Sequence, residues 1–181
     1  MAREKIALLG GSFNPVHHGH VSLADNVART GLVDEVWLSL SPRNPFKDSS
    51  ILMPAAERMQ LLEKAIEGYE RLKATDIELS LPEPSYTIDA LDALADAYPD
   101  REFTLLIGAD NLSGLTRWKN WRQLLERYGA IVYPRGTISI ELPPELAGYS
   151  SRITILDRMP LYNISSTQIR NQNKTGGTAE K

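Results

Sequence analysis

The residues best suited to chemistry in this sequence lie between positions 10 and 20. This stretch reads GGSFNPVHHGH and contains every histidine of the chain. An apolar run at residues 6–9 precedes it, and a segment with helical spacing at residues 21–29 follows it. A glycine turn between a strand and a helix brings free backbone N–H groups and the positive end of the helix dipole together. With His17 and His20 as further donors or cations, these groups suit a bound polyphosphate.

Two alternatives to phosphate binding stay open at this stage. A glycine turn after a strand often serves packing alone. A zinc site would need more ligands, and the chain has no cysteine and no histidine outside residues 17–20. A carboxylate such as Asp110 would then have to complete the metal shell. The gathering of all imidazoles in a four-residue window favours the phosphate hypothesis.

A second cluster of polar residues, reading ISSTQIR, occupies positions 164–170. Ser165, Ser166 and Thr167 stand where a helix would begin, with Ser166 as its cap, and Arg170 follows one turn later. Hydroxyls, helix-start N–H groups and a forked guanidinium together hold phosphate oxygens well. The alternative is a capped helix with a surface arginine.

Three further positions have residue types that suit a nucleotide. Asp110 ends an apolar strand, where its carboxylate either accepts hydrogen bonds from ribose hydroxyls or caps a helix. Thr87 is the expected cap of a helix, and amides at a helix start suit a carboxylate. Trp118 either stacks on a flat ring or packs in the core.

The elements that must position these residues alternate along the chain. Strands are predicted at residues 6–9, 34–40, 76–80, 102–107, 130–133 and 152–156, and helices at 21–29, 55–72, 87–98 and 118–128. This alternation predicts an α/β fold with a Rossmann-like doubly wound, mostly parallel sheet and helices on both faces. Ligands of such sheets bind beyond the carboxyl ends of the strands, which is where the motifs fall.

Composition narrows the class of protein. The 181 residues predict a single domain over 1–170, followed by a polar tail over 171–181 that is expected to be disordered. The net charge of −3 argues against a nucleic-acid partner. No apolar run approaches the roughly 20 residues that span a bilayer. The N-terminus runs directly into the first strand without a signal peptide. With no cysteine in the chain, we expect a cytoplasmic protein without membrane contacts; a homo-oligomer remains open.

The two motifs together resemble those of the nucleotidyltransferases that carry an H-x-G-H sequence, here His17 to His20, and a later I-S-S-T-x-I-R sequence. Their order and their separation of about 150 residues are more specific than either motif alone. Within this superfamily the chain is most similar to bacterial nicotinate-nucleotide adenylyltransferases, from residue 5 to about residue 170. The resemblance implies that the α-phosphate of ATP is transferred, as an adenylyl group, to nicotinate mononucleotide, giving deamido-NAD and pyrophosphate.

The resemblance also implies roles for individual residues. The catalytic residues would be His17, His20 and Arg170. ATP would be bound by Gly10, Gly11, Ser12, Phe13, Gly19, Gly108, Asp110, Ile164, Ser165, Ser166 and Thr167. Nicotinate mononucleotide would be bound by Asn44, Lys47, Tyr86, Thr87, Trp118 and Arg135. No residue is assigned to a metal, because Mg²⁺ would accompany ATP and be held by phosphates and water.

The chain departs from the family pattern at three places, one of which is the polar end after Arg170, where the family usually continues through a further helix. Phe46 replaces a histidine that usually precedes the lysine equivalent to Lys47, and Arg135 follows a proline instead of preceding one. Related acceptors, nicotinamide mononucleotide or phosphopantetheine, therefore remain alternatives, as does a non-catalytic nucleotide-binding module. A P-loop ATPase or kinase is disfavoured because no G-x-x-x-x-G-K-[ST] sequence occurs.

Overall fold

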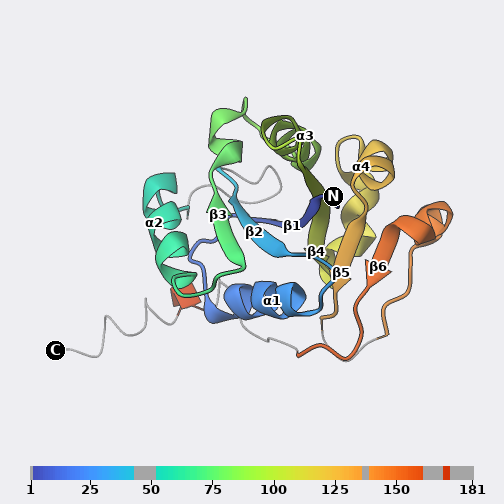
Figure 1. Cartoon of the computed structure of the whole chain (residues 1–181), viewed down its shortest axis with the longest axis horizontal. Helices are drawn as coiled ribbons and strands as arrows, with labels where there is room; N and C mark the ends of the chain where they lie inside the picture. Colours follow the sequence, from blue (N-terminus) through green and yellow to red (C-terminus); the bar gives the residue numbers. More distant parts are fainter. Residues whose placement is uncertain (1, 43–51, 136–138, 161–168, 172–181) are drawn as a thin grey trace.

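The computed structural model of the chain describes residues 2–42, 52–135, 139–160 and 169–171 (Figure 1). Here α denotes an α-helix, η a 3₁₀ helix and β a strand. In chain order the elements are β1 (Glu4–Gly11), α1 (His18–Arg29), β2 (Glu35–Leu40), α2 (Ala55–Ala65), β3 (Leu72–Thr75), η2 (Ile77–Ser80), α3 (Thr87–Ala97), β4 (Arg101–Gly108), η3 (Ala109–Arg117), α4 (Trp121–Arg127), β5 (Ala130–Tyr133), η4 (Pro144–Arg152) and β6 (Ile153–Ile155). Among the described residues, no helix has both the length and the apolar character needed to cross a bilayer.

The six strands form one sheet in the order β3-β2-β1-β4-β5-β6, and every neighbouring pair is parallel. The chain builds outward from β1 through β2 to β3, then crosses back and continues from β4 to β6 on the other side. The strand order therefore reverses between β1 and β4, the place where open α/β sheets form a crevice for ligands. In the register of the pairs, Leu8 of β1 stands between Trp37 of β2 and Leu105 of β4. The predicted doubly wound fold is confirmed.

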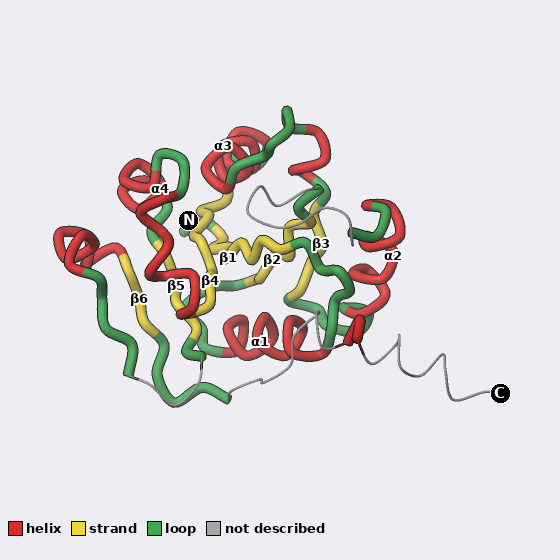
Figure 2. The backbone as a smooth tube through the Cα atoms, turned by 180° about the vertical axis from the view of Figure 1, so that it is seen from behind, coloured by secondary structure: helices red, strands yellow, loops and turns green. Residues whose placement is uncertain are grey.

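Helices cover both faces of the sheet, with α1 on one side and α3 and α4 on the other (Figures 1 and 2). Alternation along each strand creates the two apolar layers, because successive side chains point to opposite faces. The layer beneath α3 and α4 includes Ile6, Leu8, Phe103, Leu105, Ile107, Leu91, Leu94 and Leu124. The layer beneath α1 and α2 includes Ala7, Val36, Leu38, Leu106, Ile131, Ala24, Val27 and Leu62.

Several predicted elements differ from the observed ones in their bounds, and one differs in its type. The helix predicted over 55–72 ends at Ala65, and Gly68 then takes a φ of +84° that an α-helix cannot continue through. The edge strand follows directly, at Leu72–Thr75, and the predicted strand at 76–80 is instead the 3₁₀ helix η2. The helix predicted from residue 118 starts only at Trp121, because Asn120 has a left-handed φ of +51°.

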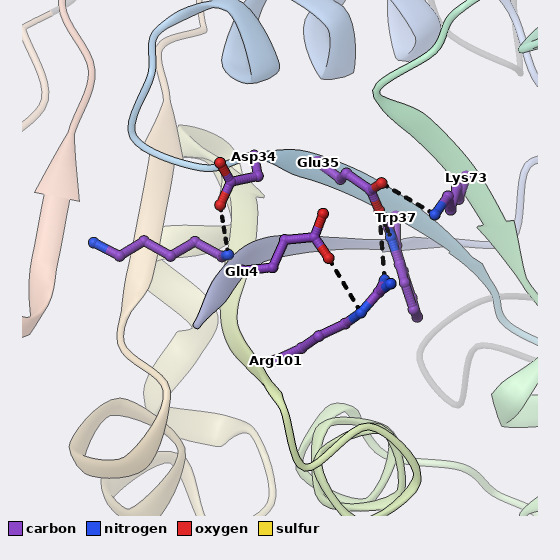
Figure 3. A network of polar contacts seen from close by, with 7 residues as sticks. Glu4, Asp34, Glu35, Trp37, Lys73 and Arg101 are labelled. Carbon is purple, nitrogen blue, oxygen red and sulfur yellow. Dashed lines mark hydrogen bonds and ion pairs between the residues drawn. The ribbon is translucent and has the colours of Figure 1, made fainter. Parts of the chain in front are cut away.

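A polar network joins the amino-terminal ends of β1, β2 and β4 (Figure 3). These ends lie opposite the carboxyl ends of the strands, where the site is predicted. Glu35 lies at its centre: it accepts a 2.7 Å hydrogen bond from the indole of Trp37 and forms ion pairs with Lys73 at 3.0 Å and Arg101 at 3.6 Å. Arg101 also pairs with Glu4 at 3.3 Å and stacks 5.2 Å from the Trp37 ring. This network ties the strands together at their amino-terminal ends, away from the carboxyl ends where the site is predicted.

Candidate active site

The loop after β1 has the predicted strand–turn–helix form. Gly10 and Gly11 are the last residues of the strand, and a side chain added at Gly10 would meet no atom within 4 Å, so a ligand has room to approach the backbone there. Phe13 turns the chain with a φ of +45° and is itself buried. The extended His17 is the N-cap of α1, which begins at His18, earlier than the predicted residue 21.

The imidazoles of His17 and His20 stack on each other, with ring centroids 3.7 Å apart and an interplanar angle of 23°. The backbone N–H of His17 donates to Nδ1 of His20 at 3.2 Å, so a neutral His20 carries its proton on Nε2. The ring of Phe13 supports the other side of His20 edge-on, at 5.0 Å between centroids. The loop therefore holds both histidines in fixed orientations at the start of the helix.

His17 is neutral at physiological pH. Burial lowers the pKa of its imidazole from 6.5 to about 4, and electrostatic interactions with His18 and Arg135 act in the same direction. Within the described part of the chain, its Nδ1 is buried and has no hydrogen-bond partner. This lowered pKa favours a neutral, hydrogen-bonding His17 in the protein without ligand, and its role at a phosphate stays a prediction.

The two sequence motifs meet in space at one described contact. A guanidinium N–H of Arg170 donates to the backbone carbonyl of Asn14 across a separation of 156 residues. Asn14 is buried in the loop between β1 and α1, so Arg170 lies beside that loop. The other predicted members of the second motif, Ile164, Ser165, Ser166 and Thr167, lie outside the described residues, as does the predicted cap role of Ser166.

The predicted G-x-D pair lies at the carboxyl end of β4 and extends into η3. The Asp110 carboxylate folds back over Gly108, where an added Cβ would stand 2.6 Å from its Oδ1. Arg135, which follows β5, places its guanidinium 3.6 Å from Asp110, and both side chains are about half exposed. A cavity of about 370 Å³ is lined by these two residues and by Ala109, Leu112, Ser113, Ser139, Ile140, Glu141 and Pro143.

This position bears on two earlier hypotheses. Arg135 is predicted to bind the mononucleotide, but it lies beside Asp110, which is predicted to bind ATP. The position of Arg135 therefore does not tell which substrate it contacts, and its role stays a prediction. Asp110, the carboxylate considered for a zinc shell, pairs with Arg135 instead. No group of three His, Asp or Glu side chains that could hold a metal ion occurs in the ranges that the structure describes.

The residues predicted for the mononucleotide ring come together on the α3 side of the sheet. Tyr86 is the N-cap of α3, Thr87 is its first residue, and Tyr86 and Trp118 pack half-buried against the same apolar layer. Lys119 links the two segments, because its ammonium lies 5.0 Å from the Tyr86 ring and 2.9 Å from the Asp89 carboxylate. The predicted Asn44 and Lys47, and the departing Phe46, lie outside the described residues.

Sequence reasoning missed two buried polar residues, Arg58 and Glu78, which contact residues at or just after the carboxyl ends of β1 and β2. Arg58 is only 1% exposed and donates to backbone carbonyls after β1 and β2. Glu78 accepts a 3.2 Å hydrogen bond from Ser39, and burial raises the pKa of its carboxyl from 4.5 to about 7. For Arg58 the sequence did hold a clue, since Arg58, Leu62 and Ile66 recur every fourth residue and all three are buried.

Comparison with known proteins identifies the family. The model of the cytidylyltransferase-like family matches residues 8–172. A Bacteroides fragilis protein named "Probable nicotinate-nucleotide adenylyltransferase" is 41% identical over 179 residues, covering 97% of this chain and 85% of that protein. A protein of the same name from Cytophaga hutchinsonii is 43% identical over 167 residues, covering 92% and 84%.

Solved structures support the fold. The nicotinic acid mononucleotide adenylyltransferase of Plasmodium falciparum, complexed with NaAD, superposes with a TM-score of 0.77 at 20% identity, covering 93% of this chain and 83% of that one. The sequence matches extend over nearly the whole chain and include both motif regions. This chain therefore belongs to the nicotinate-nucleotide adenylyltransferases, within the cytidylyltransferase-like family.

Proposed function

We propose that this protein joins ATP and nicotinate mononucleotide to give deamido-NAD and pyrophosphate, a step in NAD synthesis. The names of its relatives support this reaction. The single observation in the structure that carries it is the contact between Arg170 and Asn14, which brings the second motif to the loop of the first. Groups suited to a polyphosphate thereby converge from both ends of the chain.

In this reaction a 5′-phosphate oxygen of the mononucleotide forms a bond to the α-phosphorus of ATP. The bond from that phosphorus to the oxygen bridging the α- and β-phosphates breaks, and its electron pair leaves with pyrophosphate. Phosphate is a competent nucleophile at neutral pH, so the reaction needs no covalent intermediate and no general base. The protein acts by holding the two substrates in line and by stabilising charge on the phosphate oxygens.

The first motif supplies donors for these oxygens. His17 is neutral and acts as a hydrogen-bond donor, and His20 carries its proton on Nε2 when neutral. We propose that both donate to the α- and β-phosphates. Backbone N–H groups at the start of α1 would donate to further phosphate oxygens, and the open space at Gly10 would let the phosphates approach the backbone. Arg170 adds the permanent positive charge, and Asp110 accepts from the ribose.

ATP-dependent nucleotidyl transfer generally uses a divalent cation, and we propose Mg²⁺, which supplies neutralisation of the phosphate charge when bound. The described residues offer no cluster of three acidic or imidazole side chains that could hold an ion. We propose that the cation would be held mainly by substrate oxygens and water, which is usual for Mg²⁺ in proteins.

We propose that a preference for nicotinate mononucleotide over nicotinamide mononucleotide comes from residues at the start of α3. The start of α3 presents backbone N–H groups at Tyr86 and Thr87, and Lys119 places a cation beside Tyr86. Both features favour a carboxylate. Trp118, half-buried nearby, is proposed to stack on the ring.

The partners in this proposal are small molecules, ATP and the mononucleotide. We propose the cytoplasm as the compartment, since it supplies ATP.

The test is release of pyrophosphate from Mg-ATP with nicotinate mononucleotide, nicotinamide mononucleotide and phosphopantetheine in parallel. Release with the first substrate far above the other two is expected. Release with another acceptor would overturn the substrate assignment, and ATP binding without release from any acceptor would indicate a binding module.

A variant pair tests the role of the first motif. His20→Ala should lower kcat by at least about a hundredfold, as loss of a transition-state donor does, while circular dichroism stays unchanged. The matched control is His18→Ala, since His18 is the exposed neighbour on the same helix turn and should retain activity within a few fold. Equal activities of the two variants would contradict the assignment.

A further inference from the structure

Arg58 occupies an unusual place for an arginine. It lies on α2 and is 1% exposed. Its Nε donates to the carbonyl of Met53 at 2.8 Å, and Nη1 donates to the carbonyls of Ser12 at 2.8 Å and Ser41 at 2.7 Å. Its Nη2 donates to Pro42 at 3.0 Å. Four backbone carbonyls thus converge on one guanidinium.

These carbonyls come from segments with different predicted ligands. Ser12 belongs to the loop after β1, which we assign to ATP. Ser41 and Pro42 directly follow β2 and precede Asn44 and Lys47, which the sequence resemblance assigns to the mononucleotide. The two segments also touch directly, since the N–H of Ser41 donates to the carbonyl of Gly11 at 2.8 Å. Arg58 therefore spans the boundary between the two halves of the site.

A further tie joins the same segments. The side-chain oxygen of Asn14 accepts the backbone N–H of Met53 at 3.0 Å, and the Asn14 carbonyl accepts from Arg170. Arg58, through Met53 and Ser12, holds the residues on both sides of this tie. The position of Asn14, and with it the point where Arg170 attaches, depends on α2.

The cost of burying Arg58 is offset by the backbone carbonyls that its guanidinium joins. Burying a guanidinium is costly unless strong partners compensate, and no carboxylate forms an ion pair with Arg58 in the part of the chain that is described. An apolar side chain of similar length would avoid that cost, but it would take the donor away from four backbone carbonyls. What only a forked, five-donor group provides is simultaneous contact with carbonyls of separate loops.

We propose that Arg58 is a positioning residue that sets the distance and angle between the ATP-binding and mononucleotide-binding loops. This inference rests on the proposed function. Arg58 touches neither substrate, so each substrate alone should bind nearly normally when it is replaced. The reaction between them should be slow, because a misplacement of 1 Å costs roughly a hundredfold in rate.

The experiment compares Arg58→Lys and Arg58→Met with the wild-type chain. Lysine keeps the charge and loses the fork, and methionine keeps the packing volume without the charge. Arg71→Lys is the matched control, because Arg71 also donates to a carbonyl, that of Ala28 at 3.2 Å, but on a different segment. The measurements are ATP affinity by titration calorimetry, kcat for pyrophosphate release, and the melting temperature.

We expect ATP affinity within about threefold of wild type for both Arg58 variants, while kcat falls at least about tenfold for lysine and further for methionine. Arg71→Lys should keep both values. Proportional losses of affinity and kcat, kcat equal to that of the control, or failure of both variants to fold would each overturn the proposal. Since the wild-type chain is assayed alongside, inactivity of that chain would count against the proposed function and not against Arg58 alone.

Discussion

Protonation of Glu78 should control the pH dependence of stability, and Glu78→Gln should reveal it. Glu78 is 6% exposed, and its carboxylate accepts a 3.2 Å hydrogen bond from Ser39, which is 1% exposed. Burial raises the pKa of the carboxyl from 4.5 to about 7, although the hydrogen bond from Ser39 acts in the opposite direction. Between these two pH values the folded protein keeps the proton that the unfolded chain has lost.

The sign follows from proton binding. Because the folded state binds more protons between pH 4.5 and about 7, the free energy of unfolding falls as the pH rises through this window. Each pH unit inside it corresponds to about 1.4 kcal/mol, so the contribution of Glu78 declines by roughly 2–3 kcal/mol between pH 5 and pH 8. Glutamine does not titrate. The free energy of unfolding of Glu78→Gln should therefore rise by about this amount relative to wild type over that range.

Comparison of the two proteins at each pH removes the effect of other groups. His17 acts in the opposite direction, since its lowered pKa of about 4 makes stability fall as the pH drops below 6.5, but it is present in both proteins. The assay is urea unfolding followed by tryptophan fluorescence at pH 5, 6, 7 and 8. Glu83→Gln, at an exposed position, is the control for the exchange itself. A difference between Glu78→Gln and wild type that stays constant within about 0.5 kcal/mol across the series would refute the reasoning.

Three further substitutions test other parts of the structure. Gly108→Ala would put a methyl group 2.6 Å from Oδ1 of Asp110 and displace that carboxylate, so the KM for ATP should rise several fold at unchanged melting temperature; an unchanged KM in steady-state kinetics would contradict the role of Asp110. Arg101→Leu removes the ion pairs at the far edge of the sheet, and urea unfolding should show a loss of about 1–2 kcal/mol with normal kcat. Gly129→Ala combines a φ of +69° with a Cβ 2.8 Å from the carbonyl of Arg152, and should cost at least about 1 kcal/mol by the same assay; wild-type stability would show that the turn relaxes freely.

The sequence predicted the central strands well because their side chains are buried on both faces. Residues 130–133 were predicted with the observed bounds, and the predicted strand at 102–107 extends by one residue at each end. The prediction failed at 76–80, where alternating residues resemble a strand. There the backbone N–H of Ile77 bonds to the Thr75 hydroxyl and that of Leu79 to Asp76. Such local bonds compete with pairing to a neighbouring strand, and periodicity does not register them.

For the site, local motifs predicted the loop of His17 and His20, because glycine spacing and helix start are encoded within a few residues. The roles of the substrate-contacting residues remain predictions. Arg58 and Glu78 escaped prediction because their burial depends on carbonyls and hydroxyls contributed by distant segments. The spacing of Arg58 with Leu62 indicates a shared helix face, but a sequence pattern does not show which distant groups will accept or donate to Arg58 and Glu78.

The central position of β1 has a consequence for synthesis on the ribosome. β1 precedes the other described strands in the chain, and its neighbour β2 follows after a single helix. Its other neighbour, β4, is made only after β2, α2, β3 and α3. Until then one edge of β1 has no strand to pair with, and the face of Ile6 and Leu8 lacks the cover of α3. Until β4 has been made, the nascent chain therefore exposes an unpaired edge of β1 and an apolar face that can associate with other chains. We expect protection of β1 from proteases to appear abruptly once β4 has left the exit tunnel.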